Sequence, residues 1–277
     1  MTTWKRLRRY PASIIGFAIV FFFLLMSIIG PAVAPYGYAS QNIRARLQPP
    51  SQDHFFGTDQ FGRDIFSRII VGSRDVYLAA GCSTALAVFL GLILGLFSGY
   101  KGGILDEIVM RSMDVIMSIP SLLLAMVVLF SLGPSRLNLI LVVGFLYIPM
   151  VSRVVRSVVL DVKTREFVEA AKLRGEKSSY ILFREIMPNV LPHLAVEASM
   201  RFSYAIFTVA SLGFLGLGVQ PPAPDWGFMV SDARTWFGQA PWVMLAPAGA
   251  IALLVVGVGF MSDGLSKLLL PGGVGNV

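Results

Sequence analysis

Residues 164–188 have the sequence TREFVEAAKLRGEKSSYILFREIMP, a charged stretch between two long apolar runs. Its first half predicts a helix over 164–174, because side chains three and four residues apart share one helix face. That predicted face carries Phe167, Ala170, Ala171 and Arg174. Gly175 follows as a natural stop, since glycine readily takes the left-handed conformation that ends helices.

A second short helix is predicted over 178–187, ended by Pro188. Two helices joined at a glycine turn would form an L-shaped protrusion, with apolar contacts offered by Tyr180, Ile181 and Phe183. A solvated hairpin is the simplest interpretation. Short helices are marginal alone in water, however, and persist when they are packed. We therefore expect the protrusion to bind a protein partner.

The rest of the chain is dominated by apolar sequence. Hydrophobic residues make up 55% of the 277 positions and charged residues 14%, against about 25% charged in an average globular protein. A membrane-spanning helix needs roughly 20 mostly apolar residues. The runs that approach this length are 12–34, 76–100, 114–133, 137–152, 194–219 and 243–268. The sequence therefore predicts an all-α membrane protein with six transmembrane helices.

Positive charge is unevenly shared between the predicted loops. With both termini cytoplasmic, fifteen of the 23 Lys and Arg residues lie in inner segments, among them Lys5, Arg6, Arg8 and Arg9. This distribution follows the positive-inside rule. We expect a multi-pass protein of the bacterial plasma (inner) membrane with both termini in the cytoplasm. The alternative is a signal peptide cleaved after 32–34, but the apolar run is longer than a signal core.

The motif Glu169-Ala170-Ala171, Gly175 and Pro188 resembles one in ABC-importer permeases. In that family E-A-A-x3-G, followed by Pro about thirteen residues later, marks a cytoplasmic loop that engages a separate ATPase. The resemblance implies the binding-protein-dependent (type I) permease fold, with a docking loop over 153–192. It also implies the partners: a second homologous permease subunit, two ABC ATPase subunits and an extracytoplasmic substrate-binding protein.

Two outer stretches are similar to one branch of that family, the dipeptide/oligopeptide/nickel importers. Residues 54–68 match the H-x-x-G-T-D-x-x-G-R-D-x-x-S-R run of the smaller (C-type) subunit, and 214–227 match its F-L-G-L-G-x-x-x-P…W-G run. Val209 departs from the pattern, because peptide-type members often have Glu there. The outer motif residues are Gly57, Thr58, Asp59, Gly62, Arg63 and Asp64; the last two could pair locally or cap a helix that starts near Ile65.

Charged residues also fall within or beside the predicted spans: Asp114, Glu197, Arg201 and Asp263. Charges at membrane depth are candidates for function. Glu197 and Arg201 are four residues apart, in the order that favours an ion pair on a helix. Because all four residues lie within two turns of a predicted inner end, we expect a structural ion-pair network at the cytoplasmic vestibule in preference to a substrate site.

Two patterns predict how the spans pack and bend. Gly91, Gly95 and Gly99 form a stripe of small residues, typical of close packing between spans, with a substrate path as the alternative. Pro120 interrupts the third run and predicts a kink there.

The chain lacks the sequence marks of an enzyme. It has no G-x4-G-K-[ST] phosphate-binding loop, so ATP would be bound and hydrolysed by the partner ATPase chains. Cys82, His54 and His193 do not have metal-ligand spacing, and we expect neither a metal nor a cofactor. The alternatives from other classes are an ion-coupled carrier and an intramembrane hydrolase. Few acidic groups near mid-span disfavour the first, and the separated histidines disfavour the second.

The resemblance thus implies a non-catalytic translocation subunit of an ATP-binding-cassette importer for di- or oligopeptides. Nickel–chelator (metallophore) complexes and glutathione are the alternative solutes. Residues 1–72 are expected to form an N-terminal transmembrane helix and an extracytoplasmic segment, and residues 73–270 the permease core. The basic surplus follows the membrane topology, so we expect lipid and no nucleic acid as its partner.

Overall fold

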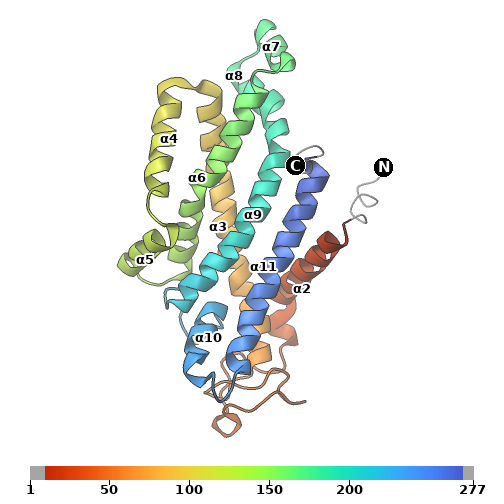
Figure 1. Ribbon diagram of the computed structural model, residues 1–277, viewed down its shortest axis with the longest axis vertical. Coiled ribbons are helices and arrows are strands. Elements are labelled where there is room, and N and C mark those ends of the chain that lie inside the picture. The colour runs from red at the N-terminus through yellow and green to blue at the C-terminus, as the bar shows by residue number, and fades with distance from the viewer. Residues whose placement is uncertain (1–9, 271–277) are drawn as a thin grey trace.

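The computed structural model describes residues 10–270, and this part of the chain is helical, without a strand (Figure 1). Five long helices run side by side: α2 (Pro11–Val33), α3 (Ile65–Lys101), α6 (Arg136–Val162), α9 (Met187–Phe214) and α11 (Trp242–Leu269). The shorter elements are η1 (Ile43–Ala45), α4 (Gly103–Met117), α5 (Ser121–Leu132), α7 (Glu166–Leu173), α8 (Ser178–Tyr180), η2 (Ile181–Ile186), α10 (Trp226–Asp232) and η3 (Ala233–Trp236).

The predicted spans all lie in helices. By length and composition α2, α3, α6 and α11 can each cross a membrane, and the bent pair α4–α5 brings the number to five. The sixth predicted span lies in α9, which is 28 residues long but less apolar because it contains Glu197 and Arg201. The all-helical membrane fold expected from the sequence is therefore confirmed.

Helices α3 and α6 form the most extensive helix pair in the described chain. The glycine stripe of α3 makes this contact. A Cβ atom on Gly91 would lie 2.6 Å from the Cβ of Val151, and one on Gly95 would lie 2.6 Å from the carbonyl oxygen of Ser152. Only glycine allows the two backbones to come this close. The stripe serves packing, as the first of its two interpretations predicted.

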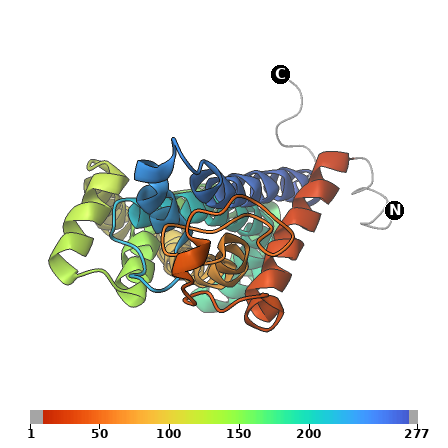
Figure 2. The same cartoon turned by 90° about the horizontal axis from the view of Figure 1, so that it is seen from below.

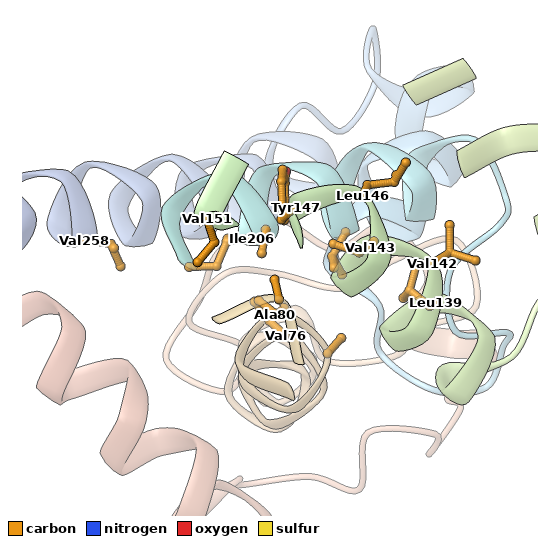
Figure 3. Packing of buried hydrophobic residues seen from close by; sticks show 14 of the residues in the cluster. Val76, Ala80, Leu139, Val142, Val143, Leu146, Tyr147, Val151, Ile206 and Val258 are labelled. Atoms are coloured by element: carbon orange, nitrogen blue, oxygen red, sulfur yellow. The ribbon is translucent and has the colours of Figure 1, made fainter. Parts of the chain in front are cut away.

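The core lies where α3 and α6 meet α9 and α11. Figure 3 shows Val76 and Ala80 of α3 facing the buried side chains of α6, with Ile206 of α9 and Val258 of α11 beside them. These residues are almost fully buried. Dispersion contacts across this close-packed seam hold the helices in a fixed arrangement.

Two elements flank this core on opposite sides, α2 on one and the α4–α5 pair on the other (Figure 2). The axes of α4 and α5 differ by 83° across the break at 118–120, which confirms the predicted kink. Arg156 of α6 binds Asp106 of α4 through two hydrogen bonds of 2.6 Å each. Much of the remaining surface of α4 is apolar and exposed.

Several predicted boundaries move. The division between residues 72 and 73 falls inside α3, so the two predicted parts share one helix. Helix α6 continues through Pro149 to Val162, and α9 begins at Met187, so the segment outside the long helices is shorter than 153–192. The basic residues 5–9 and the end of the chain after 270 lie outside the described residues.

Replacing Gly95 by valine should strongly lower the yield of folded protein in membranes, because the new side chain would collide with the α6 backbone. Gly81→Val is the matched control, since Gly81 lies on the same helix with open space around it. Fluorescence-detected size exclusion of detergent extracts measures both variants. Similar monodisperse peaks for the two would contradict the close packing of α3 on α6.

Candidate functional site

Helix α7 protrudes from one end of the bundle and ends in a defined cap (Figure 1). Gly175 has φ +76°, in the left-handed region, and no atom of residues 10–270 outside its own turn lies within 4 Å of where a Cβ would be. The N–H of Gly175 donates to the carbonyl oxygen of Lys172 at 2.9 Å, and the N–H of Glu176 donates to that of Ala171 at 3.2 Å. These two bonds form a Schellman motif. The predicted helix stop at Gly175 is confirmed.

The predicted contact face of this protrusion divides in two. Ala171 and Ile181 are buried, together with Val168, and they attach the protrusion to the rest of the chain. The side chains left exposed are Phe167, Ala170, Arg174, Tyr180 and Phe183. Ala171 and Ile181 are therefore not available to a partner, because the protrusion uses them for its own packing.

The sequence analysis missed the most exposed apolar side chain of the protrusion. Leu173, in the last turn of α7, is 89% exposed. It follows Ala170 by three residues, a spacing that places the two on adjacent turns of one face.

The second helix of the protrusion differs from its prediction. A short α8 passes into a π-helical segment, η2, and then directly into α9, so the chain stays helical beyond Pro188. Pro188 does not end the helix: it follows the π-helical turn of η2 directly, so its missing N–H falls where the regular i→i−4 hydrogen-bond pattern is already interrupted. Phe183 packs edge-to-face on Phe97 of α3, with ring centroids 6.5 Å apart.

The polar groups of the protrusion are only loosely engaged. Arg174 lies 3.6 Å from a carboxylate oxygen of Glu185 and 3.8 Å from one of Glu176. Exposed pairs of this kind contribute at most about 1 kcal/mol. Glu169 is exposed, and within residues 10–270 its side chain makes no hydrogen bond.

At the opposite end, the outer motif forms a tight loop before α3. Gly57 and Gly62 have φ +73° and +70°. A Cβ on Gly62 would lie 1.8 Å from the carbonyl oxygen of Asn42, so the loop closes on itself only with glycine there. Thr58 donates to the carbonyl oxygen of Ala45.

The charged residues of this motif fix the start of α3. A carboxylate oxygen of Asp64 accepts a hydrogen bond from the N–H of Ser67 at 2.7 Å and so caps the helix, as one of the two interpretations predicted. The other oxygen of Asp64 lies 2.9 Å from Nδ1 of His54. Arg63 pairs with Asp59 at 2.5 Å, not with Asp64. All four groups serve the fold of the loop.

The two outer stretches, far apart in the sequence, meet in space. Arg68 of α3 is almost fully buried, and its Nη1 donates to the carbonyl oxygens of Tyr38 at 2.8 Å and of Pro222 at 3.4 Å. The indole N–H of Trp226 donates to the carbonyl oxygen of Ile69 at 3.1 Å. The motif residues of both stretches therefore build one outer assembly.

Asp225 caps α10 within this assembly. It accepts hydrogen bonds from the N–H groups of Phe228 at 2.8 Å and Val219 at 3.3 Å, and its side chain is buried. Burial disfavours the charged form and raises the pKa of this carboxyl to about 6.

The predicted network of four charges near the inner face is wrong. Only Glu197 and Arg201 come together, with Oε1 of Glu197 2.8 Å from Nε of Arg201. Asp114 pairs with Arg153 on an exposed surface, and Asp263 is exposed. Because α9 begins at Met187 and ends at Phe214, Arg201 sits near its middle.

Within residues 10–270, no three His, Cys, Asp or Glu side chains are grouped to hold a metal ion. The described chain is a bundle of membrane-spanning helices with a packed outer assembly and an apolar protrusion at the other end. These features define a multi-pass membrane protein.

Comparison with known proteins gives its family. Residues 91–272 match the family described as binding-protein-dependent transport system inner membrane component, and residues 2–50 match the N-terminal TM domain of oligopeptide transport permease C. The chain therefore belongs to the binding-protein-dependent permeases, the inner membrane components of ABC importers, in the dipeptide/oligopeptide/nickel branch that its motifs resemble.

Curated relatives align over nearly the whole chain. The dipeptide transport system permease protein DppC of Alkalihalophilus pseudofirmus is 40% identical, over 97% of this chain and 88% of the relative. The probable D,D-dipeptide transport system permease protein DdpC of Escherichia coli is 40% identical, over 96% and 89%. The oligopeptide transport system permease protein OppC of Bacillus subtilis is 36% identical, over 98% and 90%.

The raised pKa of Asp225 predicts a specific pH dependence. The folded state holds this proton more tightly than the unfolded chain, so the stability that the group contributes is present below pH 3.8 and is lost as pH rises through about 6. Asp225→Asn keeps an acceptor for the cap but cannot ionise. Its thermal-unfolding midpoint in detergent should fall less than the wild-type midpoint between about pH 4.5 and pH 7.5.

The exposed Asp53 provides the control, because Asp53→Asn removes an outer carboxyl that is not buried. This variant should retain the wild-type slope. A wild-type slope in Asp225→Asn as well would show that the Asp225 carboxyl is ionised throughout this range.

Proposed function

We propose that this chain is the translocation subunit of an importer for di- or oligopeptides, energised by ATPase chains that dock on α7 and the segment leading into α9. The apolar tip of α7 is the observation that carries the docking part. Leu173, Phe167 and Tyr180 are exposed on a protrusion whose inner face is already packed. A surface of this kind is stabilised by burial against another protein.

The cap of α7 suggests how force would pass to the spans. The Schellman motif at Gly175 sets the angle between α7 and α8, and the chain then continues as helix through η2 into α9. Movement of a docked ATPase would therefore be transmitted directly to α9 at mid-membrane. Closure of two ATPases would in this way drive alternating access in the permease.

The peptide solute is supported by the relatives, whose names specify dipeptide or oligopeptide transport. Val209, where peptide-type members often have Glu, is buried in the core. We therefore favour peptides over nickel–chelator complexes and glutathione as the solute.

Gly175→Val tests the docking proposal. Valine disfavours the left-handed conformation, so the variant should insert normally but turn α8 away from its position. Peptide uptake and the ATP hydrolysis stimulated by loaded binding protein should both fall at least about tenfold, because the loss of a single well-fitted contact of about 1.4 kcal/mol already gives that factor. Hydrolysis by the reconstituted complex, with and without loaded binding protein, is the measurement.

Gly133→Val is the matched control for strain. Gly133 also has a left-handed φ, +83°, and open space around it. It lies just before the start of α6, whereas α7 follows the end of α6, so the two glycines are far apart. Its stimulated hydrolysis should stay close to wild type. Full stimulation in Gly175→Val would reduce the protrusion to a solvated hairpin.

We further propose that α7 and both termini are cytoplasmic. The start of α2 and the end of α11 lie at the same end of the bundle as α7, and the segment 34–64 and α10 lie at the other (Figure 1). Reporter fusions after Gly37 and Pro222 should therefore report outside, and fusions after Lys172 and Val277 inside. A cytoplasmic signal from the Pro222 fusion would overturn this orientation and the docking proposal together.

A further inference from the structure

Arg201 lies at the mid-height of the helix bundle. Its Nη1 is 2.7 Å from the sulfur of Met150, in the middle of α6. Two residues further along α9, the hydroxyl of Ser203 donates to the carbonyl oxygen of Val255, in the middle of α11, at 3.3 Å. Three helices are thus in register at this level, and the guanidinium is far from both ends of the spans.

The hydrogen-bonding capacity of Arg201 is only partly used. Nε lies within ion-pair distance of Glu197 but makes no aligned hydrogen bond. Nη1 donates to a thioether, which is a weak acceptor. Nη2 has no hydrogen-bond partner within residues 10–270. Glu197 balances the charge, yet the outer edge of the guanidinium is left without an oxygen acceptor.

The surroundings of this edge are polar and partly open. The guanidinium lies over the ring of Tyr204, 4.9 Å from its centroid, and 5.9 Å from that of Tyr147. Tyr147 shares a 2.7 Å hydrogen bond with Thr208, one turn above Tyr204. The side chain of Arg201 is 13% exposed and Tyr204 is 55% exposed. Ionisable groups at this depth face a protein interior or a water-filled cavity, not lipid.

We propose that Arg201, framed by Tyr147 and Tyr204, is a subsite for the carboxylate of the solute as it crosses the membrane. The proposal rests on the proposed peptide function. A peptide with a free C-terminus carries a carboxylate, and a guanidinium edge with free N–H donors matches it in charge and geometry. Glu197 keeps the arginine neutralised when no solute is present, and it stays behind the guanidinium, with only 5% of its side chain exposed.

A structural tie between α9 and α6 is the competing role for Arg201, and the two roles differ in one measurable respect. Loss of a tie would slow the transport of every solute alike. Loss of a carboxylate subsite would slow a peptide acid more than the same peptide with an amidated C-terminus. The ratio of the two uptake rates therefore separates the roles.

The experiment uses the whole complex in proteoliposomes, with labelled alanyl-phenylalanine and its C-terminal amide at concentrations that saturate the binding protein. Glu197→Gln combined with Arg201→Met removes both charges, so that neither is left unpaired in a buried site. The acid-to-amide uptake ratio of this double variant should fall about tenfold, the loss expected for a hydrogen bond to a charged group. Arg201→Lys keeps the positive charge but loses the planar guanidinium with its parallel N–H donors. It should lower the acid-to-amide uptake ratio less.

Arg234→Met is the control, because it removes an exposed outer arginine and should keep the wild-type ratio. If the double variant fails to assemble, the Arg201→Lys comparison alone decides. If the wild-type complex imports peptide and the double variant keeps the wild-type acid-to-amide ratio, the subsite is overturned and the peptide function stands. A wild-type complex that imports neither peptide would overturn the peptide function and the subsite with it.

Discussion

The close packing of α3 against α6 is the contact on which the other elements depend. Each glycine in a helix costs roughly 0.5–1 kcal/mol relative to alanine, so a stripe of three is retained only where it permits a gain elsewhere. Here the gain is the approach of Gly91 and Gly95 to the backbone of α6 around Ser152. In lipid, where no hydrophobic force favours helix association, this fit of surfaces supplies the stabilisation.

This seam joins the two ends of the molecule. The N-terminal end of α3 is capped by Asp64 within the outer assembly, and the C-terminal end of α6 leads directly into the protrusion that carries Leu173. Helix α9 packs on both α3 and α6, and its charged pair, Glu197 and Arg201, lies near the middle of the bundle. A change at either end is thus connected to the middle of the membrane by rigid helices, as an importer requires.

Most buried polar side chains of the outer assembly are bonded to backbone groups. Arg68, Asp225 and Trp226 are buried, and each makes such a hydrogen bond. These residues explain why many positions of the two outer motifs carry specific residue types. In this irregular region their side chains supply hydrogen bonds that regular secondary structure supplies elsewhere. Four buried side-chain nitrogens of the described residues lack a hydrogen-bond partner: Nε of Arg68, Nδ1 of His193, Nε of Arg201 and Nε1 of Trp242.

Local properties determined by the sequence itself were predicted correctly. Hydropathy predicted the six apolar runs, and a side-chain cap predicted the helix start at Ile65. A proline without an N–H predicted the bend at Pro120, and a left-handed glycine predicted the stop at Gly175. The tertiary structure decided what depends on neighbours distant in sequence. It buried Ala171 and exposed Leu173, because one side of α7 packs on its own chain. It paired Asp114 with Arg153, and it placed Arg201 near the middle of α9, because that helix begins at Met187, before the apolar run. Hydropathy reports where a chain enters lipid, but only packing sets where a helix begins and which partner each charge meets.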